Sequence, residues 1–376
     1  MSEWKEYKLG DVSSFVNNKI LSKEISVIDY ISTENMISDK GGVVQATNIP
    51  DSGTITKFER NNILISNIRP YFKKIWFASK SGGCSNDVLC FKGNTNIIDD
   101  KYLYYLLSQD EFFDYVMLGS KGCKMPRGDK SHMINFSFSL PPLSKQKQIA
   151  GILSSLDDKI DLLNRENKTL EAMAETLFRK WFVEDANEDW EEGKLGDEID
   201  FTMGQSPDGE SYNEDKMGIP MYQGNADFGF RFPQNRIYTT EPKRFAEKYD
   251  TLISVRAPVG AQNMASERCC IGRGVAAFRY KKNKKFYSYT YYKMMSLMDE
   301  IKQFNETGTV FGSISKTDFE NIDITIPNDN TIKCFQNNVQ SIDDKIINNN
   351  NQIYTISQLR DTILSKLMSG EVRVKK

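Results

Sequence analysis

Short strings in the first half of the sequence return in the second half at a nearly constant spacing. Lys8-Leu9-Gly10-Asp11 recurs as Lys194-Leu195-Gly196-Asp197, and 194 − 8 = 186. Asp157-Asp158-Lys159-Ile160 recurs at the same offset as Asp343-Asp344-Lys345-Ile346. This period is far longer than the roughly 20 to 50 residues of solenoid repeats, so it indicates a duplicated domain. We therefore expect two copies of one fold, related by a pseudo-twofold axis.

Each half changes at a proline from a strand-like to a helical pattern. Residues 1–141 hold short β-like runs and one amphipathic helix expected at Asp100–Leu118. After Pro141-Pro142, apolar residues recur at alternating steps of four and three, as in a coiled-coil seam. The first stripe is Leu156, Ile160, Leu163, Asn167, Leu170, Ala174, Leu177 and Trp181, and the second is Ile342, Ile346, Asn349, Ile353, Ile356, Arg360, Ile363 and Leu367.

Two matched stripes in one chain predict that the two helices pair with each other. A helix from Leu143 to Val183 would be about 60 Å long, which exceeds the width of a domain of this size. The alternative is that each helix packs only against its own domain. We predict an α+β fold: two mixed α/β domains alternate with two long helices that form an antiparallel coiled coil. The predicted segments are 1–142, 143–184, 185–328 and 329–376.

Composition excludes several classes of protein. With 49 Lys and Arg against 51 Asp and Glu, the net charge of −2 gives no bulk signal for nucleic acid, so any DNA-binding surface must be local. Six cysteines without a C-x-x-C pair and a single histidine, His132, predict no metal site. The start of the chain lacks the apolar run of a signal peptide, and no stretch reaches the ~18 apolar residues of a membrane span. We expect a cytosolic protein with reduced thiols.

The order of these motifs resembles the specificity subunits of Type I restriction-modification systems, and the resemblance covers essentially the whole chain. The strings that carry it, besides the duplicated ones, are Gly204-Gln205-Ser206-Pro207, Tyr212-Asn213, Gly218-Ile219-Pro220, Asp250–Pro258, Gly308–Ile314 and the junction Pro141-Pro142-Leu143. The stretch from Ser22 to Gly42 departs from this pattern.

The resemblance implies a non-catalytic protein that binds double-stranded DNA. Residues 1–142 and 185–328 would be target-recognition domains, and the helical segments would be spacers. The implied partners are two methyltransferase subunits and, for restriction, nuclease-translocase subunits. Because Gln45–Arg60 and Asp227–Glu247 differ between the halves, we expect an asymmetric two-part target with an unread gap of fixed length. Half-sites read from one DNA face lie about 34 to 36 Å apart.

Motifs of DNA-modifying enzymes are missing or incomplete. A methyltransferase acting on DNA amines needs a glycine loop for its cofactor and an Asn/Asp/Ser-Pro-Pro-aromatic motif, whereas the one Pro-Pro pair lies in Leu140-Pro141-Pro142-Leu143. Pro207-Asp208 and Glu214-Asp215-Lys216 have the residue types of a metal-dependent nuclease, but they lie in a loop-like stretch. A stand-alone Mg²⁺-dependent nuclease and a coiled-coil scaffold that binds no DNA are the two alternatives.

Candidate DNA contacts are basic and amide residues clustered in both halves, because phosphate contacts set position and base contacts specify sequence. They are Asn67, Arg69, Lys73, Lys74, Lys121, Lys124, Arg127, Gln223, Arg231, Arg244, Arg256, Arg268, Arg273 and Lys316. Phe178, Trp181 and Phe182 are candidate docking residues for partner subunits, or alternatively cap the paired helices internally. We expect no catalytic residue, no metal ligand and no cofactor.

Overall fold

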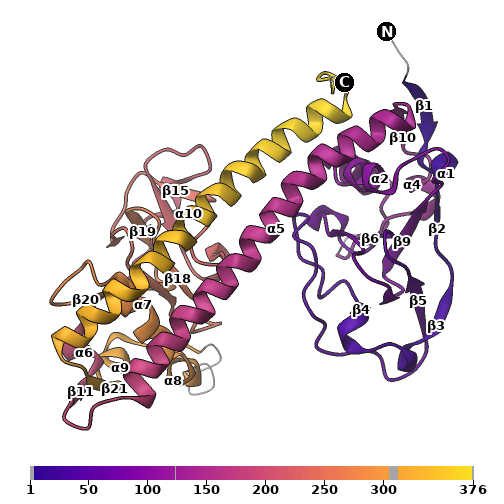
Figure 1. Ribbon diagram of the computed structural model, residues 1–376. Coiled ribbons are helices and arrows are strands. Elements are labelled where there is room, and N and C mark those ends of the chain that lie inside the picture. The colour runs from indigo at the N-terminus through magenta and orange to yellow at the C-terminus, as the bar shows by residue number, and fades with distance from the viewer. Residues whose placement is uncertain (1–3, 123, 305–311, 375–376) are drawn as a thin grey trace. The chain divides into compact units, whose positions relative to one another are not determined.

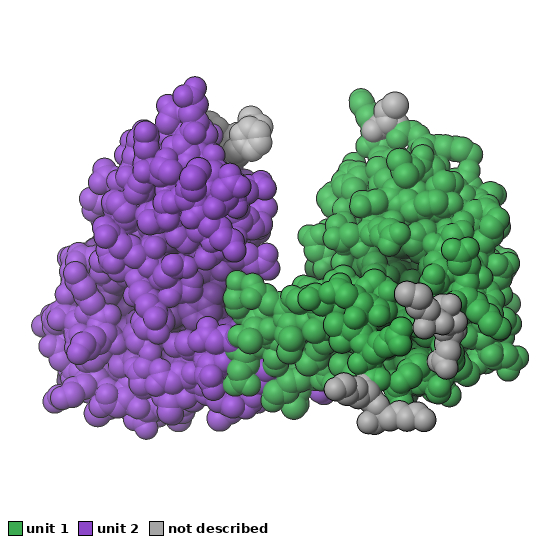
Figure 2. Space-filling view, turned by 90° about the horizontal axis from the view of Figure 1, so that it is seen from above, with its two compact units in different colours: residues 1–162, 352–376 green, residues 163–351 purple. Residues whose placement is uncertain are grey.

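The computed structural model describes residues 4–122, 124–304 and 312–374, which form two compact units. Unit 1 comprises residues 1–162 and 352–376, and unit 2 comprises residues 163–351 (Figure 2). Two long helices, α5 (Leu143–Arg179) and α10 (Asp329–Met368), each contribute a segment to both units. The division of the chain into four segments stays a prediction.

Unit 1 contains two four-stranded sheets and a two-stranded ladder (Figure 1). In spatial order the first sheet is β2 (Ser13–Phe15), β9 (Val88–Gly93), β6 (Ile63–Ser66) and β7 (Ile75–Phe77); the second is β3 (Lys19–Leu21), β5 (Thr54–Phe58), β8 (Gly82–Cys84) and β4 (Tyr30–Ile31). The ladder pairs β1 (Lys5–Lys8) with β10 (Ser137–Leu140). The helices are α1 (Leu9–Val12), α2 (Asp100–Leu107), α3 (Asp110–Leu118) and α4 (Lys130–Met133), with 3₁₀ turns η1 (Ser22–Glu24), η2 (Val27–Asp29) and η3 (Pro70–Phe72). Strands β4 and β8 are parallel, and the other neighbours are antiparallel.

The single helix expected at Asp100–Leu118 is wrong, because the structure divides it into α2 and α3. The Ser108 hydroxyl donates to the Tyr104 carbonyl oxygen at 2.7 Å, and Gln109 then adopts an extended conformation. A serine hydroxyl that binds a nearby backbone carbonyl competes with continued helix formation. Apolar periodicity alone does not reveal such a break, since the stripe continues on both sides of it.

Unit 2 has a similar architecture, with five strands instead of four in its second sheet. In spatial order its first sheet is β12 (Ile199–Met203), β20 (Val275–Tyr280), β17 (Thr251–Ser254) and β18 (Gln262–Met264); its second is β13 (Tyr212–Asn213), β15 (Ile237–Thr239), β14 (Ile219–Tyr222), β19 (Cys269–Ile271) and β16 (Phe245–Ala246). The ladder pairs β11 (Glu191–Lys194) with β21 (Asp323–Ile326). The helices are α6 (Leu195–Glu198), α7 (Tyr287–Ser296), α8 (Met298–Gln303) and α9 (Lys316–Glu320). A π-helical segment, η4 (Lys180–Glu184), follows α5, and the 3₁₀ turns are η5 (Gly209–Ser211) and η6 (Asn225–Asp227).

The repeated Lys-Leu-Gly-Asp string has the same structure in both units. It ends the first strand of the ladder and begins a short helix, α1 or α6. The Lys8 backbone N–H donates to Asp11 Oδ2 at 2.9 Å, and the Lys194 N–H donates to Asp197 Oδ2 at 2.9 Å. The first N–H groups of a helix have no partner within the helix. An aspartate at the third helical residue accepts one of them, from the residue just before the helix. The sequence repeat is therefore a repeat of local structure.

Both helical stripes face the protein interior. All sixteen positions of the two stripes are buried or half-buried. Within unit 2, Asn349 Nδ2 donates to Asn167 Oδ1 at 2.9 Å, while the rings of Phe178 and Phe335 lie 5.5 Å apart. Because the residue number in α10 falls as that in α5 rises, the two helix segments run antiparallel in this unit.

Each hydrophobic core takes residues from both long helices. In unit 1, Leu153 of α5 and Leu367 of α10 belong to the core that contains Phe91. In unit 2, Phe178 of α5 and Phe335 of α10 belong to the core that contains Phe278. The alternative, in which each helix packs only against its own domain, is not consistent with these two cores.

Candidate nucleic-acid interface

Two loops that are distant in sequence meet in unit 1 and bring several predicted DNA contacts together. The loop after β6 and the loop before α4 form a β-bridge between Ile68 and Arg127. The Arg69 N–H donates to the Pro126 carbonyl oxygen at 2.8 Å, and the Gly128 N–H donates to the Asn67 carbonyl oxygen at 3.2 Å. The structure therefore places Asn67, Arg69 and Arg127 side by side, although about 60 residues separate them. We call these two segments, residues 67–69 and 124–128, the loop pair of unit 1.

Unit 2 holds the corresponding loop pair. Arg256, after β17, forms a β-bridge with Ser313. These positions are the repeat counterparts of the bridge in unit 1, since 256 − 68 = 188 and 313 − 127 = 186 match the offsets of the surrounding strings. The string Gly308–Ile314 runs into this loop, but its residues 308–311 lie outside the described residues. The loop pair of unit 2 is therefore defined by residues 255–257 and 312–314.

Gln223 and Arg273 lie beside the loop pair of unit 2. The Val255 N–H donates to the Gly274 carbonyl oxygen, and the Gly272 N–H donates to the Tyr222 carbonyl oxygen, both at 2.9 Å. A Cβ on Gly274 would lie 2.2 Å from the Gln223 carbonyl oxygen, so only glycine fits this close approach. The turn at residues 272–274 thereby brings Gln223, Arg256 and Arg273 to one edge of the unit.

A buried aspartate that the sequence analysis missed orders this edge. Asp227 is 5% exposed, and its Oδ2 accepts the Gln223 backbone N–H at 2.7 Å. Its Oδ1 accepts two N–H groups of Arg236, at 2.5 and 3.2 Å. Gln223, Asp227 and Arg236 line a hollow of about 560 Å³. Burial of an acidic residue within a polar loop has no periodic signature, which is why sequence patterns did not reveal it.

The remaining basic candidates differ in how far neighbouring acids neutralise them. Arg69, Lys124, Arg244 and Arg256 are exposed. Five others form ion pairs: Lys73 with Asp110 (3.0 Å), Lys121 with Asp129 (2.6 Å), Arg127 with Asp87 (3.0 Å), Arg268 with Glu247 (3.3 Å) and Lys316 with Glu320 (3.2 Å). Lys74 donates to the Thr33 carbonyl oxygen at 2.7 Å, and burial lowers its pKa. Surface ion pairs are weak, so pairing reduces but does not remove the positive charge that DNA would meet.

The prediction that Arg231 contacts DNA is wrong, because its side chain is buried. Its side chain is 1% exposed, and its guanidinium binds Asp343 of α10 and, at 3.1 Å, Glu171 of α5. The guanidinium carbon also lies 3.6 Å from the centre of the Tyr291 ring. Arg231 therefore joins a loop of the globular part of unit 2 to both long helices. The sequence does not reveal this burial, because the two carboxylates that bind Arg231 lie 60 and 112 residues away in the chain.

This cluster contains two carboxylates and one guanidinium. Burial raises the pKa of Glu171, although the positive charge of Arg231 opposes the shift. Burial likewise raises the pKa of Asp343. Since a single cation cannot fully compensate two buried anions, the cluster favours retention of a proton.

Unit 1 has a smaller version of the cluster at the equivalent aspartate. Asp157 Oδ1 accepts from Arg360 Nη1 at 2.9 Å, and its Oδ2 accepts from the Tyr105 hydroxyl at 2.5 Å. Burial and the neighbouring negative charge of Asp157 raise the pKa of Tyr105. In unit 2 the Tyr292 hydroxyl donates to Asp343 Oδ1 at 3.3 Å. Both repeated aspartates therefore bind one tyrosine and one arginine.

The predicted partner-docking residues lie in an aromatic cluster of unit 2. Phe178 is 3% exposed and is not available for docking, because it packs in the core against Phe335. Trp181 and Phe182 are half-buried; the Phe182 ring lies 5.3 Å from Tyr289 and the Trp181 ring 6.2 Å from Phe335. For Phe178 the structure favours the alternative of an internal cap, whereas Trp181 and Phe182 keep part of their surface exposed.

The nuclease-like string does not form a converging site. Asp208 Oδ1 accepts the Glu210 N–H at 3.1 Å and so caps a 3₁₀ turn. Across the described residues, no group of three or more His, Cys, Asp or Glu side chains is arranged to hold a metal ion. In the same residues, no helix combines the length and apolarity that crossing a membrane requires.

Comparisons with known proteins agree with this duplicated architecture. The family described as the Type I restriction modification DNA specificity domain matches residues 1–172 and again residues 187–363. The chain is 31% identical to a putative Type I restriction enzyme specificity subunit, MjaX, of Methanocaldococcus jannaschii, over 99% of this chain and 94% of the relative. It is 25% identical to the MjaVIII specificity subunit of the same organism, again over 99% and 94%.

A solved structure supports the fold. The crystal structure of a Type I restriction-modification S subunit from M. genitalium is similar to this chain with a TM-score of 0.60 and 18% identity, over 97% of this chain and 96% of that one. At this identity the likeness concerns the fold alone. The two family matches cover most of the chain, and the chain therefore belongs to the family of Type I restriction-modification DNA specificity proteins.

Proposed function

We propose that this chain binds double-stranded DNA through both loop pairs and reads a target in two different parts. The observation that carries the proposal is that one backbone arrangement occurs in both units with different exposed side chains. Unit 1 places the exposed Arg69 and Arg127 beside the half-buried Asn67, whereas unit 2 places the exposed Gln223, Arg256 and Arg273 at or beside its loop pair. Amide and guanidinium groups form paired hydrogen bonds with adenine and guanine in the major groove. Because the side chains at and beside the two bridges differ, the two units would read different bases.

The chain would direct chemistry that other subunits perform. As its family implies, we expect two methyltransferase subunits and, for restriction, nuclease-translocase subunits, with the complex acting on DNA in the cytoplasm. Trp181 and Phe182 are the candidate docking residues that keep exposed surface. The alternative of a stand-alone nuclease is disfavoured because its carboxylates lie in a 3₁₀ turn and a loop. Incubation of the purified chain with plasmid DNA and Mg²⁺ should leave the plasmid intact.

Sequencing of modified bases in DNA from cells that express this chain with its cognate methyltransferase tests two-part reading. We expect modification at a two-part sequence with a constant gap. Arg69→Ala should relax specificity in one part, and Arg256→Ala should relax it in the other. The two variants serve as controls for each other. If Arg256→Ala instead weakened binding to all sequences equally, Arg256 would contact phosphate and would not read a base.

The proposal also assigns a role to the long helices as a coiled coil that sets the gap. One extra heptad in both α5 and α10 would lengthen the pair by about 10 Å, at ~1.5 Å per residue. Since each base pair adds ~3.4 Å, the tolerated gap should grow by about three base pairs. A seven-residue insertion in the exposed turn between β20 and α7 is the matched control and should leave the gap unchanged. An unchanged gap in the helix variant would exclude this role.

A filter-binding experiment distinguishes the scaffold alternative, which binds no DNA. If the chain recognises DNA phosphates, the logarithm of its affinity should fall linearly with the logarithm of the salt concentration. No binding at low salt would favour the scaffold, for which the near-neutral net charge is the best argument.

A further inference from the structure

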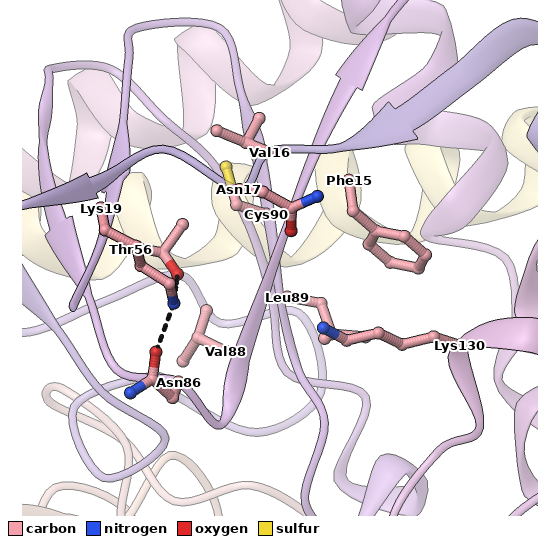
Figure 3. A pocket seen from close by; sticks show the side chains of 10 residues that line it. All are labelled: Phe15, Val16, Asn17, Lys19, Thr56, Asn86, Val88, Leu89, Cys90 and Lys130. Carbon is pink, nitrogen blue, oxygen red and sulfur yellow. Dashed lines mark hydrogen bonds between the residues drawn. The ribbon is translucent and has the colours of Figure 1, made fainter. Parts of the chain in front are cut away.

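A pocket of about 210 Å³ in unit 1 contains two lysines and no carboxylate (Figure 3). Its walls come from strands of both four-stranded sheets and from α4. The polar residues that line it are Asn17, Lys19, Thr56, Asn86 and Lys130. The chain as a whole has more acidic than basic residues, so a concave surface with two ammonium groups and no carboxylate would favour an anionic ligand.

Neutral oxygen atoms hold the Lys19 ammonium group in the pocket. Its Nζ donates to Asn86 Oδ1 at 2.7 Å and to Thr56 Oγ1 at 3.0 Å. Lys19 and Thr56 are paired residues of the neighbouring strands β3 and β5, which positions the two side chains together. An ammonium group has three N–H donors, so these two bonds leave one donor and the whole positive charge for a ligand.

Lys130 reaches the pocket from the side opposite Lys19 (Figure 3). Its Nζ lies 5.3 Å from the centre of the Phe15 ring, and among the described residues it has no carboxylate partner. A cation above a phenyl ring at an exposed site gains only ~0.5–1 kcal/mol, which does not neutralise the charge. The Phe15 ring instead limits the directions that the lysine can take.

The repeat supplies an internal comparison. The counterpart of Lys130 in unit 2 is Lys316, since 130 + 186 = 316. Lys316 forms an ion pair with Glu320 at 3.2 Å, one helical turn away. The position equivalent to Glu320 in unit 1 is Ile134, which offers no acid. The same lysine is therefore paired in one unit and open in the other.

The pocket adjoins the loop pair of unit 1. Asn86, which binds Lys19, precedes Asp87 in the chain. The Asp87 carbonyl oxygen accepts the Asn67 N–H at 2.8 Å, and its carboxylate pairs with Arg127 at 3.0 Å. A ligand that contacts the loop pair would therefore pass close to the pocket.

We propose that this pocket binds a phosphate group, and that its ligand in the working protein is one phosphate of the DNA backbone. The inference rests on the proposed function for its choice of DNA as the source. Lys19 and Lys130 supply the positive charge, and the Asn17 amide, which also lines the pocket, can donate to a phosphate oxygen. The contact is independent of base sequence, so it positions the first unit on DNA without reading it.

Because a phosphate contact needs no particular sequence, the test uses an arbitrary duplex oligonucleotide and the full chain. Lys19→Gln and Lys130→Gln should each reduce the slope of log affinity against log salt by about one and weaken binding at low salt by about tenfold. Lys101→Gln, which removes an exposed charge on α2 outside the pocket, should change neither quantity. Lys316→Gln should have a smaller effect than Lys130→Gln.

Each further outcome has a distinct meaning. If the wild-type chain binds DNA but both pocket variants keep the wild-type slope, the pocket is not a phosphate site and the proposed function stands. If the wild-type chain binds no DNA, the proposed function fails. Inorganic phosphate alone provides a second probe: thermal stabilisation of the wild type but not of Lys19→Gln, without DNA binding, would overturn DNA as the source. Unfolding temperatures of the free variants, expected to match the wild type, exclude misfolding as the cause of weak binding.

Discussion

The two units share a framework, but they provide the arginine for the repeated aspartate in different ways. In unit 2 the arginine is Arg231, from a loop of the globular part, and both it and Asp343 are 1% exposed. In unit 1 it is Arg360, from α10, and both it and Asp157 are 29% exposed. The duplicated position has kept its ionic contact while the segment that supplies the cation has changed. A framework can therefore conserve an interaction without conserving the residue that makes it.

The loop pairs differ between the units in the opposite way. There the backbone bridge is the same in both units, whereas the side chains differ. The aspartate clusters keep the chemistry and vary its source; the loop pairs keep the geometry and vary the chemistry. The first behaviour is expected of groups that hold helices to a domain, and the second of groups that discriminate ligands.

The largest expected difference between the units comes from removal of the two arginines. Arg231→Met leaves Asp343 and Glu171 buried without a cation and should lower the free energy of unfolding by about 3–5 kcal/mol. Arg360→Met leaves Asp157 with the Tyr105 hydroxyl and with water, so the loss should be no more than about 1 kcal/mol. Guanidinium chloride unfolding of the full-length variants, followed by circular dichroism, measures both. Equal losses would show that the difference in burial does not control the energetics.

A smaller difference should appear in the dependence on pH. Burial raises the pKa of Glu171 above its ordinary value of 4.5. The folded state then keeps a proton that the unfolded state releases, so this stabilisation is present below pH 4.5 and is lost as pH rises through the folded-state pKa. Glu171→Gln should flatten the decline above pH 4.5 and leave stability at pH 7 equal or about 1 kcal/mol higher.

Glu175→Gln, an exposed position one turn further along α5, is the matched control and should retain the wild-type profile. Unfolding curves across a pH series decide between these outcomes. A wild-type slope in Glu171→Gln would assign the proton to another group.

The smallest expected difference between the units concerns the part of the framework that they share. Asp11→Ala and Asp197→Ala each remove the acceptor for one backbone N–H at the start of a short helix. Each change should cost about 0.5–1.5 kcal/mol, and the two losses should agree within error. Amide hydrogen exchange of α1 and α6 reports the two units separately. A clear inequality would mean that the repeated string no longer has an equivalent role in both units.

Sequence patterns predicted the features that depend on periodicity or repetition. The heptad stripes and the duplication itself have a constant spacing that physical packing requires. The burial of Arg231 was not predictable in this way, because its partners Glu171 and Asp343 lie 60 and 112 residues away in the chain. The lysine pocket of unit 1 is similar, since Lys19 and Lys130 have no common period. Long-range polar contacts need the fold itself to be known.

The ladders at the base of the two units have a consequence for how such proteins diversify. In unit 1, Lys5 pairs with Leu140, just before α5 begins; in unit 2, Glu191 pairs with Ile326, just before α10 begins. The polypeptide thus enters and leaves each globular region through adjacent strands. We call the residues between the paired ends, 5–140 in unit 1 and 191–326 in unit 2, a cassette. Genetic exchange of one cassette would keep these strand pairs, while its core residues and, in unit 2, Arg231 would have to fit both long helices. New pairings of binding preferences could then arise by recombination, without stepwise mutation of an interface.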